Sequence, residues 1–240
     1  MAYALVGAVG AVTTGTLNNA ITPAWGTGAN RTAGDLLICW CYQSGSTGNI
    51  ATPSGWSVAI QSSTVGGPCV NIFYKIAAGG DAAPTLGGLT GSVLSGQLAE
   101  FSGNLATSPL DQTGSNAASS NPITADTGVV DTQVGELLLF GGTASLSPTG
   151  VSSLSFTSNN ASSITAAGSN NGVSTTPHWA FAYALATTSK AASTTVTETA
   201  AGGTITGMNV CGATFLIPVV GPVGGKSLNL NQALRTASLF

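Results

Sequence analysis

Histidine chemistry has one candidate in this chain. His178, in "TTPHWAFAYALA", is the only histidine, so a Ser-His-Asp or Cys-His arrangement would need it as its base. It follows a proline at the start of an apolar run, which favours a position at the surface or at a sheet edge. No Gly-x-Ser-x-Gly turn or phosphate-binding glycine loop is present. With one histidine and no Cys-x-x-Cys spacing, we expect neither a zinc site nor any other cofactor.

Paired carboxylates could hydrolyse glycosides. The acidic residues are Asp35, Asp81, Glu100, Asp111, Asp126, Asp131, Glu136 and Glu198. Asp35 and Glu136 each precede a similar apolar run, which indicates a shared role at a turn or strand entry. Glu100 ends an apolar run and is expected to have a structural partner such as Arg31 or Lys75. The stretch "DTGVVD" from Asp126 lacks the oxygen ligands of a calcium loop. We therefore expect no catalytic or metal-binding residues, and a protein that is not an enzyme.

The four cysteines are predicted to be free. Cys39 and Cys41 are two apart in a strand-like run, so their side chains share a face. Neighbours of this kind do not normally form a disulfide. Cys69 and Cys211 lie in other apolar runs, where an unpaired thiol behaves as a small hydrophobic group. The sequence therefore predicts four buried thiols.

Three tryptophans could bind sugars. Trp25, Trp56 and Trp179 could act as stacking platforms for a glycan, or they could pack in turns and in the core. Packing is the commoner role for tryptophan in a β-sandwich.

The chain contains very little charge. Only 5% of its 240 residues are charged and the net charge is −3, whereas an ordinary soluble domain has about 25% charged residues. No basic patch could neutralise several phosphates, so nucleic acid is not an expected partner. Ser, Thr, Asn, Gln and Gly must cover the surface. Such a surface costs little to desolvate, so it suits a protein that works in an assembly.

No membrane partner is expected either. The mean hydropathy is +0.35, but no apolar run reaches the roughly 18 residues that a membrane helix needs. The start, "MAYALVGAVGAVTTG", has no positive charge before its apolar run, so it is predicted to be the first strand and not a signal peptide. Synthesis in the cytoplasm is therefore expected.

The pattern along the chain predicts an all-β fold. Short runs of Val, Ile, Leu, Phe, Tyr and Thr alternate with Gly, Ser, Asn and Pro. The expected strands are Tyr3–Val12, Asp35–Tyr42, Ser57–Ser62, Val70–Ala77, Leu94–Phe101, Glu136–Thr143, Ser152–Thr157, Ser162–Ala167, Trp179–Ala186, Ser193–Thr199 and Met208–Ile217. The polar stretch between about Ser102 and Gln133 is expected to be a long loop with a short strand.

Four phrases recur in the same order. "AGDLLICWCYQSG" from Ala33 resembles "VGELLLFGGTASL" from Val134, and "TPSGWSVAIQSS" resembles "SPTGVSSLSFTS". "YKIA" and "YALA" follow, and then "GQLAEF" and "NVCGATF". These matches predict an antiparallel β-sandwich, jelly-roll-like, built from two related halves at about 1–103 and 121–218. Apolar residues on both faces of the run Leu36–Tyr42 favour one sandwich over two small domains.

The C-terminal segment, 219–240, is predicted to be a docking arm. Prolines and glycines separate it from the last strand, and it is rich in leucine but poor in charge. A disordered tail would normally have the opposite composition. Folding back onto its own sandwich is the alternative. The expected contact residues are Leu228, Leu230, Leu234, Leu239 and Phe240.

The block "AGDLLICWCYQSG…TPSGWSVAIQSS…VNIFYKIAAGGDAAPTLGG…SGQLAEFSGNLATSPLDQTG" resembles a family of structural proteins of tailed-bacteriophage virions. The second half, from "VGELLLF" to "CGATFLIP", follows the same order. The resemblance covers about Ala33 to Pro218 and implies a β-sandwich carried as a capsid decoration, minor capsid or minor tail component. It implies no catalytic residues and does not extend to the arm.

The expected function is therefore structural. We expect a capsid decoration or accessory protein, made in the host bacterial cytoplasm and located in the virion. Its expected partners are the major capsid protein or other virion proteins and further copies of itself, with a trimer favoured. The alternative is a minor tail or fibre-associated protein that binds host-surface glycans through Trp25, Trp56 or Trp179.

Overall fold

The structure is a computed structural model. It describes residues 2–15, 19–45, 49–63, 68–87, 93–103, 108–126, 133–147, 153–170, 178–188, 195–201 and 204–217. The predicted arm lies outside the described residues. All regular elements in the described ranges are β-strands, and all strand pairs are antiparallel, which confirms the predicted all-β fold.

The first sheet has the strand order β1-β6-β3-β5-β4, and β2 also pairs with β6. Its strands come from the first part of the chain. They are β1 (Ala4–Leu5), β2 (Thr13–Gly15), β3 (Leu36–Gln43), β4 (Ser57–Ser63), β5 (Cys69–Ile76) and β6 (Leu94–Ser102).

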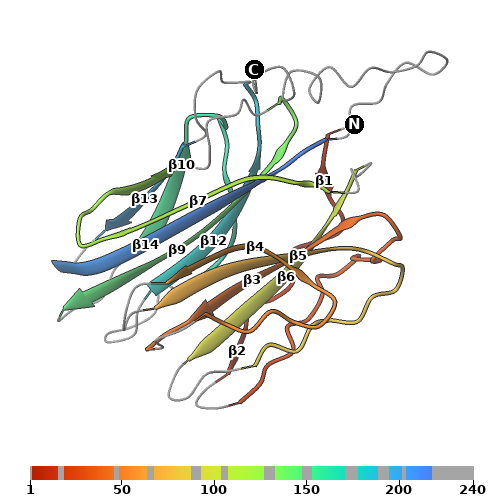
Figure 1. The fold of residues 1–240 in the computed structure, drawn as a ribbon, viewed down its shortest axis with the longest axis horizontal. Helices are drawn as coiled ribbons and strands as arrows, with labels where there is room; N and C mark the ends of the chain where they lie inside the picture. Colours follow the sequence, from red (N-terminus) through yellow and green to blue (C-terminus); the bar gives the residue numbers. More distant parts are fainter. Residues whose placement is uncertain are drawn as a thin grey trace, which may run out of the picture.

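The second sheet has the order β11-β12-β9-β14-β7, and a third sheet has the order β10-β13-β8. Their strands come from the remainder of the described chain. They are β7 (Leu110–Ala118), β8 (Ile123–Asp126), β9 (Leu137–Ser147), β10 (Ser153–Ser158), β11 (Thr165–Asn170), β12 (His178–Leu185), β13 (Thr195–Ala201) and β14 (Thr204–Phe215). Figure 1 shows the first and second sheets facing each other, with β10 and β13 beyond the second sheet.

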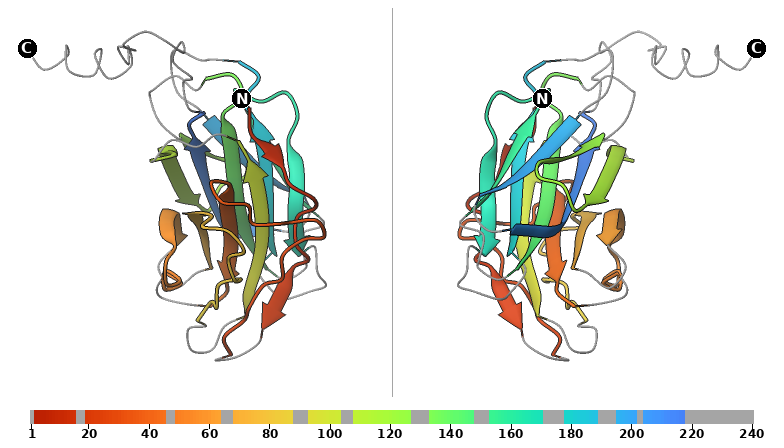
Figure 2. Two further views of the ribbon diagram at one scale, coloured as in Figure 1. Left: turned by 90° about the vertical axis from the view of Figure 1, so that its right-hand side faces the viewer. Right: turned by 90° about the vertical axis from the view of Figure 1, so that its left-hand side faces the viewer.

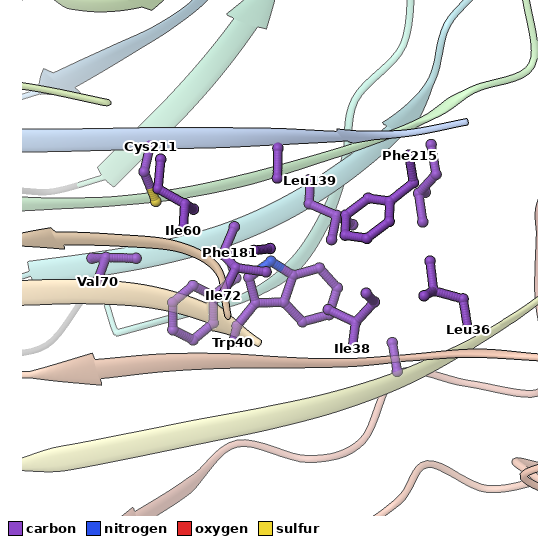
Figure 3. Packing of buried hydrophobic residues seen from close by; sticks show 14 of the residues in the cluster. Leu36, Ile38, Trp40, Ile60, Val70, Ile72, Leu139, Phe181, Cys211 and Phe215 are labelled. Carbon is purple, nitrogen blue, oxygen red and sulfur yellow. The ribbon is translucent and has the colours of Figure 1, made fainter. Parts of the chain in front are cut away.

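The main core lies between the first and second sheets. Trp40 of β3 stacks on Phe181 of β12 with 6.2 Å between ring centroids, and Tyr42 stacks on Trp179 at 5.9 Å. Trp40 lies near the middle of this layer, beside Phe181 and Ile72 (Figure 3). These contacts join the two sheets across one shared core.

Two further cores lie outside this layer. Leu138 and Phe140 of β9 face the third sheet, where they pack with Ile123 and other apolar side chains. On the outer face of the first sheet, Leu37 and Cys39 pack under loop residues. All eight residues of β3 are therefore buried, as the two-sided apolar pattern predicted. Figure 2 shows the strands from the two sides, with the N-terminus at one end of the sandwich and β2 toward the other.

The same turn precedes the central strands of both sheets. Gly34 and Gly135 each have a φ of 92°, and their amides donate to the carbonyls of Ala77 and Ala186 at 2.9 and 2.8 Å. The carbonyl oxygens of Asp35 and Glu136 accept from the same two alanines. The strand-entry role predicted for these two acids is therefore confirmed.

The first and second sheets also have matching strand orders around their central strands. In the first sheet β3 lies between β5 and β6, and in the second sheet β9 lies between β12 and β14. Leu36 opposes Phe101 as Leu137 opposes Phe215. Successive strands from β3 to β6 stay within one sheet, so this order does not confirm a jelly roll. An origin of the two sheets from one repeated unit stays a prediction.

The N-terminal strand differs from the prediction. Tyr3–Val12 was expected to be continuous, but β1 contains two residues and β2 begins only at Thr13. Gly7 has a φ of 66°, which turns the chain away from β6, and the amide of Gly10 then returns to the carbonyl of Leu98. The segment therefore follows the edge of β6 irregularly.

Candidate functional site

Charged and aromatic residues gather on the outer face of the first sheet, near the end that carries the Gly34 turn. Glu100 lies near the end of β6 and opposes Leu37 of β3, so it is close to Asp35 at the entry to β3. The segment before β3 supplies Thr32, whose amide donates to Oε1 of Glu100 at 2.8 Å. Strand register and this turn thus bring two carboxyl groups together.

The carboxyl groups of Asp35 and Glu100 are close enough for Glu100 to raise the pKa of Asp35. Burial is the largest cause, and burial and the neighbouring Glu100 carboxyl together raise the pKa of Asp35 to about 6. Two carboxylates this close repel each other when both are ionised, so the site favours a proton on one of them. The pair is therefore suited to holding a proton.

The partners expected for Glu100 were wrong. Lys75 pairs with Asp81, with 2.5 Å between Nζ and Oδ1. Asp81 also accepts hydrogen bonds from the amides of Ala78 and Gly79. Burial raises the pKa of Asp81, but these hydrogen bonds and Lys75 outweigh burial, so the pKa is lower than usual. Arg31 donates from Nη1 to the carbonyl of Ala29 at 2.8 Å. In the described part of the chain, neither cation forms an ion pair with Glu100.

Glu136 occupies the matching position at the entry to β9, but it is fully buried, with 0% exposure. Its pKa is raised to about 8: burial is the largest cause, the backbone of Gln133 partly opposes it, and the charge of Asp111 adds to it. Burial also raises the pKa of Tyr3, and Glu136 adds to this shift. The Tyr3 hydroxyl donates to the carbonyl of Leu216 at 2.8 Å. Glu136 is therefore mostly protonated at neutral pH.

The three tryptophans have different surroundings. Trp179 is 1% exposed in the main core, so it offers no face to a glycan. Trp56 is 8% exposed and stacks on Trp25, with 6.5 Å between centroids. Trp25 is half-buried, and the guanidinium carbon of Arg31 lies 5.9 Å from its ring centroid. Of the three, only Trp25 presents appreciable surface.

His178 was expected at the surface or at a sheet edge, and this was wrong, because it is buried and β12 lies between β11 and β9. It begins β12 but is buried, and its Nδ1 lies 3.1 Å from the carbonyl oxygen of Asn170. The side chain at this strand position faces the third sheet, because the alternate residue Trp179 faces the main core.

The cysteine prediction is confirmed. All four cysteines are free and buried. The Sγ atoms of Cys39 and Cys41 are 3.4 Å apart, on the outer face of the first sheet. Burial raises the pKa of the Cys41 thiol, and its contact with Cys39 raises it further. These thiols are therefore unreactive packing groups in the folded chain.

The remaining candidate residues are scattered. Within the described ranges, no three His, Cys, Asp or Glu side chains are placed to hold a metal ion. Asp126 ends β8, and the backbone of Glu198 lies in β13. Asp131 and the arm residues Leu228, Leu230, Leu234, Leu239 and Phe240 lie outside the described residues. The described part of the chain also contains no helix that could cross a membrane.

Sequence reasoning missed the carboxyl pair and the burial of Glu136. The isolated position of Glu100 at the end of an apolar run was a signal that this acid has a special partner. Comparison with protein-family models, curated proteins and solved structures found no match for the chain.

Proposed function

We propose that this chain is a structural protein of a tailed-phage virion, acting as a capsid decoration or accessory protein. In this role it binds the major capsid protein or other virion proteins and copies of itself. It acts by coating and stabilising the particle and not by catalysis.

A surface with almost no charge carries this proposal. The whole chain has 13 charged residues, five basic and eight acidic. Among the described ones, Glu100 and Glu136 are buried, and Lys75 and Asp81 neutralise each other. The surface that remains is mostly Ser, Thr, Asn and Gly, which loses little hydration energy when another protein covers it. Interfaces are depleted in charge at their centres for the same reason.

The test is to locate the chain on particles. An antibody raised against the purified protein is applied to tailed-phage particles from the bacterium that carries the gene, and the label is imaged by electron microscopy. We expect label distributed over the head. Particles without label would overturn the proposal, and label confined to the tail would favour the second candidate.

The second candidate is a tail-associated protein that binds host-surface glycans. Trp25 favours it, because this half-buried ring lies beside Arg31, an arrangement that could stack a sugar and bond its hydroxyls. Against it, Trp56 and Arg31 already contact the ring. Cell-wall oligosaccharides titrated into the protein and into Trp25→Ala test this role, with Trp179→Phe as a buried control. Saturable binding lost only in Trp25→Ala would support it.

A further inference from the structure

Strand β10 differs from the other strands at sheet edges. It pairs with β13 through six consecutive residues with no register shift, from Ser153↔Ala201 to Ser158↔Val196. Its sequence, "SLSFTS", contains no charge, proline or glycine. In the described part of the chain, no strand pairs with its other side. Natural proteins usually protect such an edge with a charge, a proline or a bulge.

The other edges carry such protection. Register shifts interrupt β4 at Val58/Ile60 and β11 at Ala166/Gly168. Gln97 also donates to the carbonyl of Ala167 in β11 at 2.8 Å. A shift in β14 at Ala213/Phe215 disturbs its pairing with β7.

The remaining edges are occupied or short. In β8 the carbonyl of Thr124 accepts from Asn116 of β7 at 2.7 Å. β1 and β2 contain only two and three residues. Among the described edges, β10 alone is regular, uncharged and long enough to accept a strand.

The C-terminal arm contains a segment that fits this edge. Twenty-three residues follow Ile217, the last described residue, and Ser227–Asn231 reads "SLNLN". Its leucines alternate with polar residues, as Leu154 and Phe156 alternate with Ser and Thr in β10. Leu154 and Phe156 pack against the core under the third sheet. Leu228 and Leu230 placed beside them would continue the same apolar face.

We propose that Ser227–Asn231 of one copy adds as a fourth strand to β10 of a second copy of this chain. The proposal deepens the structural role proposed above and rests on it, because a protein that coats a particle needs contacts between copies. The contact is heterologous: each copy gives an arm and receives one. A closed ring satisfies every arm and every edge, which accommodates the expected trimer. Hydrogen bonds between the two backbones provide the affinity, and packing of Leu228 and Leu230 fixes the register of the added strand.

Cross-linking of full-length single-cysteine variants tests this pairing. Asn229→Cys places a thiol on the polar face of the arm, and Ser155→Cys places one on the exposed face of β10. The four native cysteines are buried, so a folded variant has one reactive thiol. Equal amounts of the two variants are mixed and treated with a short bis-maleimide. Ser115→Cys, exposed on the protected edge strand β7, replaces Ser155→Cys in the matched control.

We expect a covalent dimer from the Asn229→Cys and Ser155→Cys mixture and at least tenfold less from the Ser115→Cys control. Equal yields from both mixtures, or no dimer in either, would overturn the proposal. A Ser155→Cys dimer formed without the arm variant would show β10 paired with β10. Cross-linking within a chain that carries both substitutions, persisting on dilution, would show the arm bound to its own sheet.

Two checks keep the outcome clear. A variant that unfolds is recognised because five thiols react in place of one, and Thr157→Cys, also exposed on β10, then replaces Ser155→Cys. Failure of this inference is separate from failure of the proposed function. The antibody label would still lie on the head if copies contact each other elsewhere.

Discussion

Gly34 and Gly135 have the same backbone angle, a φ of 92° at each, but different neighbours. A Cβ added to Gly34 would meet no atom within 4 Å, whereas at Gly135 it would lie 3.1 Å from the Cβ of Ala2 and 3.5 Å from Cδ1 of Ile217. An alanine at Gly34 would therefore cause backbone strain alone, whereas an alanine at Gly135 would cause the same strain and also crowd its neighbours.

Gly34→Ala is expected to lower the free energy of unfolding by roughly 1–2 kcal/mol, because a side chain in the left-handed region is strained. Gly135→Ala should cost more, since its Cβ must also displace Ala2. Denaturant titration measures both. Gly87→Ala is the control, because its added Cβ meets no atom and its φ is not positive. Equal losses at Gly34 and Gly135 would contradict the crowding argument.

Stability is expected to increase as the pH is lowered from about 8.5 to 5.5. Asp35 and Glu136 have raised pKa values, about 6 and about 8, so both bind protons more tightly in the folded chain than in the unfolded one. Their favourable contribution is complete below their unfolded values and is lost as the pH rises through the folded values. Thermal unfolding across this range measures the slope. A flat profile would contradict the prediction.

Glu136→Gln should remove the part of this slope between about pH 6 and pH 8. The neutral amide need not lose a proton, so at pH 8.5 we expect a gain of roughly 2–4 kcal/mol. Asp35→Asn is the matched control, because it should flatten the profile only below about pH 6.5. Lower stability of Glu136→Gln at pH 8.5 would mean that the buried carboxylate is favourably bound.

Thr143→Val is expected to stabilise the protein by about 1 kcal/mol. Thr143 is buried between Trp179 and Asn209 in the second sheet, and its hydroxyl has no partner among the described residues. Thr214→Val is the control: Thr214 is equally buried, but its Oγ1 accepts from the amide of Gln112 at 3.1 Å, so valine should destabilise. Destabilisation by both would point to a water bonded to Thr143.

The four thiols should react slowly in the folded protein at pH 8 and completely after unfolding. All are buried, and burial raises the pKa of Cys41 and Cys69. Labelling of unfolded protein without prior reduction should modify four thiols per chain. Labelling of only two thiols per chain would indicate a disulfide and would contradict the prediction. The spacing of Cys39 and Cys41 within one strand does not favour such a bond.

Most of the strands could be predicted because they bury apolar side chains. The central strands β3 and β9 are apolar on both faces, and the sequence located each within two residues at its start. The stretch that holds β7, Leu110–Ala118, was expected to be a long loop with one short strand, but β7 has nine residues and β8 follows it. Strand β7 lies at an edge, much of it is exposed, and its pairing with β14 determines its conformation. An exposed edge strand of this kind has no alternating apolar pattern from which it could be predicted.

The candidate site was less predictable, because it depends on register. Asp35 and Glu100 are 65 residues apart in the chain, and only the pairing of β3 with β6 brings them together. The burial of Trp179 and the partial exposure of Trp25 depend on which sheet face each residue occupies. Local sequence did not determine this for residues at strand ends and in loops.

The second sheet is packed on both sides, and this has a consequence for how the molecule unfolds. Leu138 and Leu139 are adjacent in β9, yet one belongs to the core under the third sheet and the other to the main core. Unfolding of β9 would therefore expose both cores at once, so neither core is expected to unfold while the other stays folded. The three sheets are therefore expected to unfold as one cooperative unit, because both cores share the second sheet.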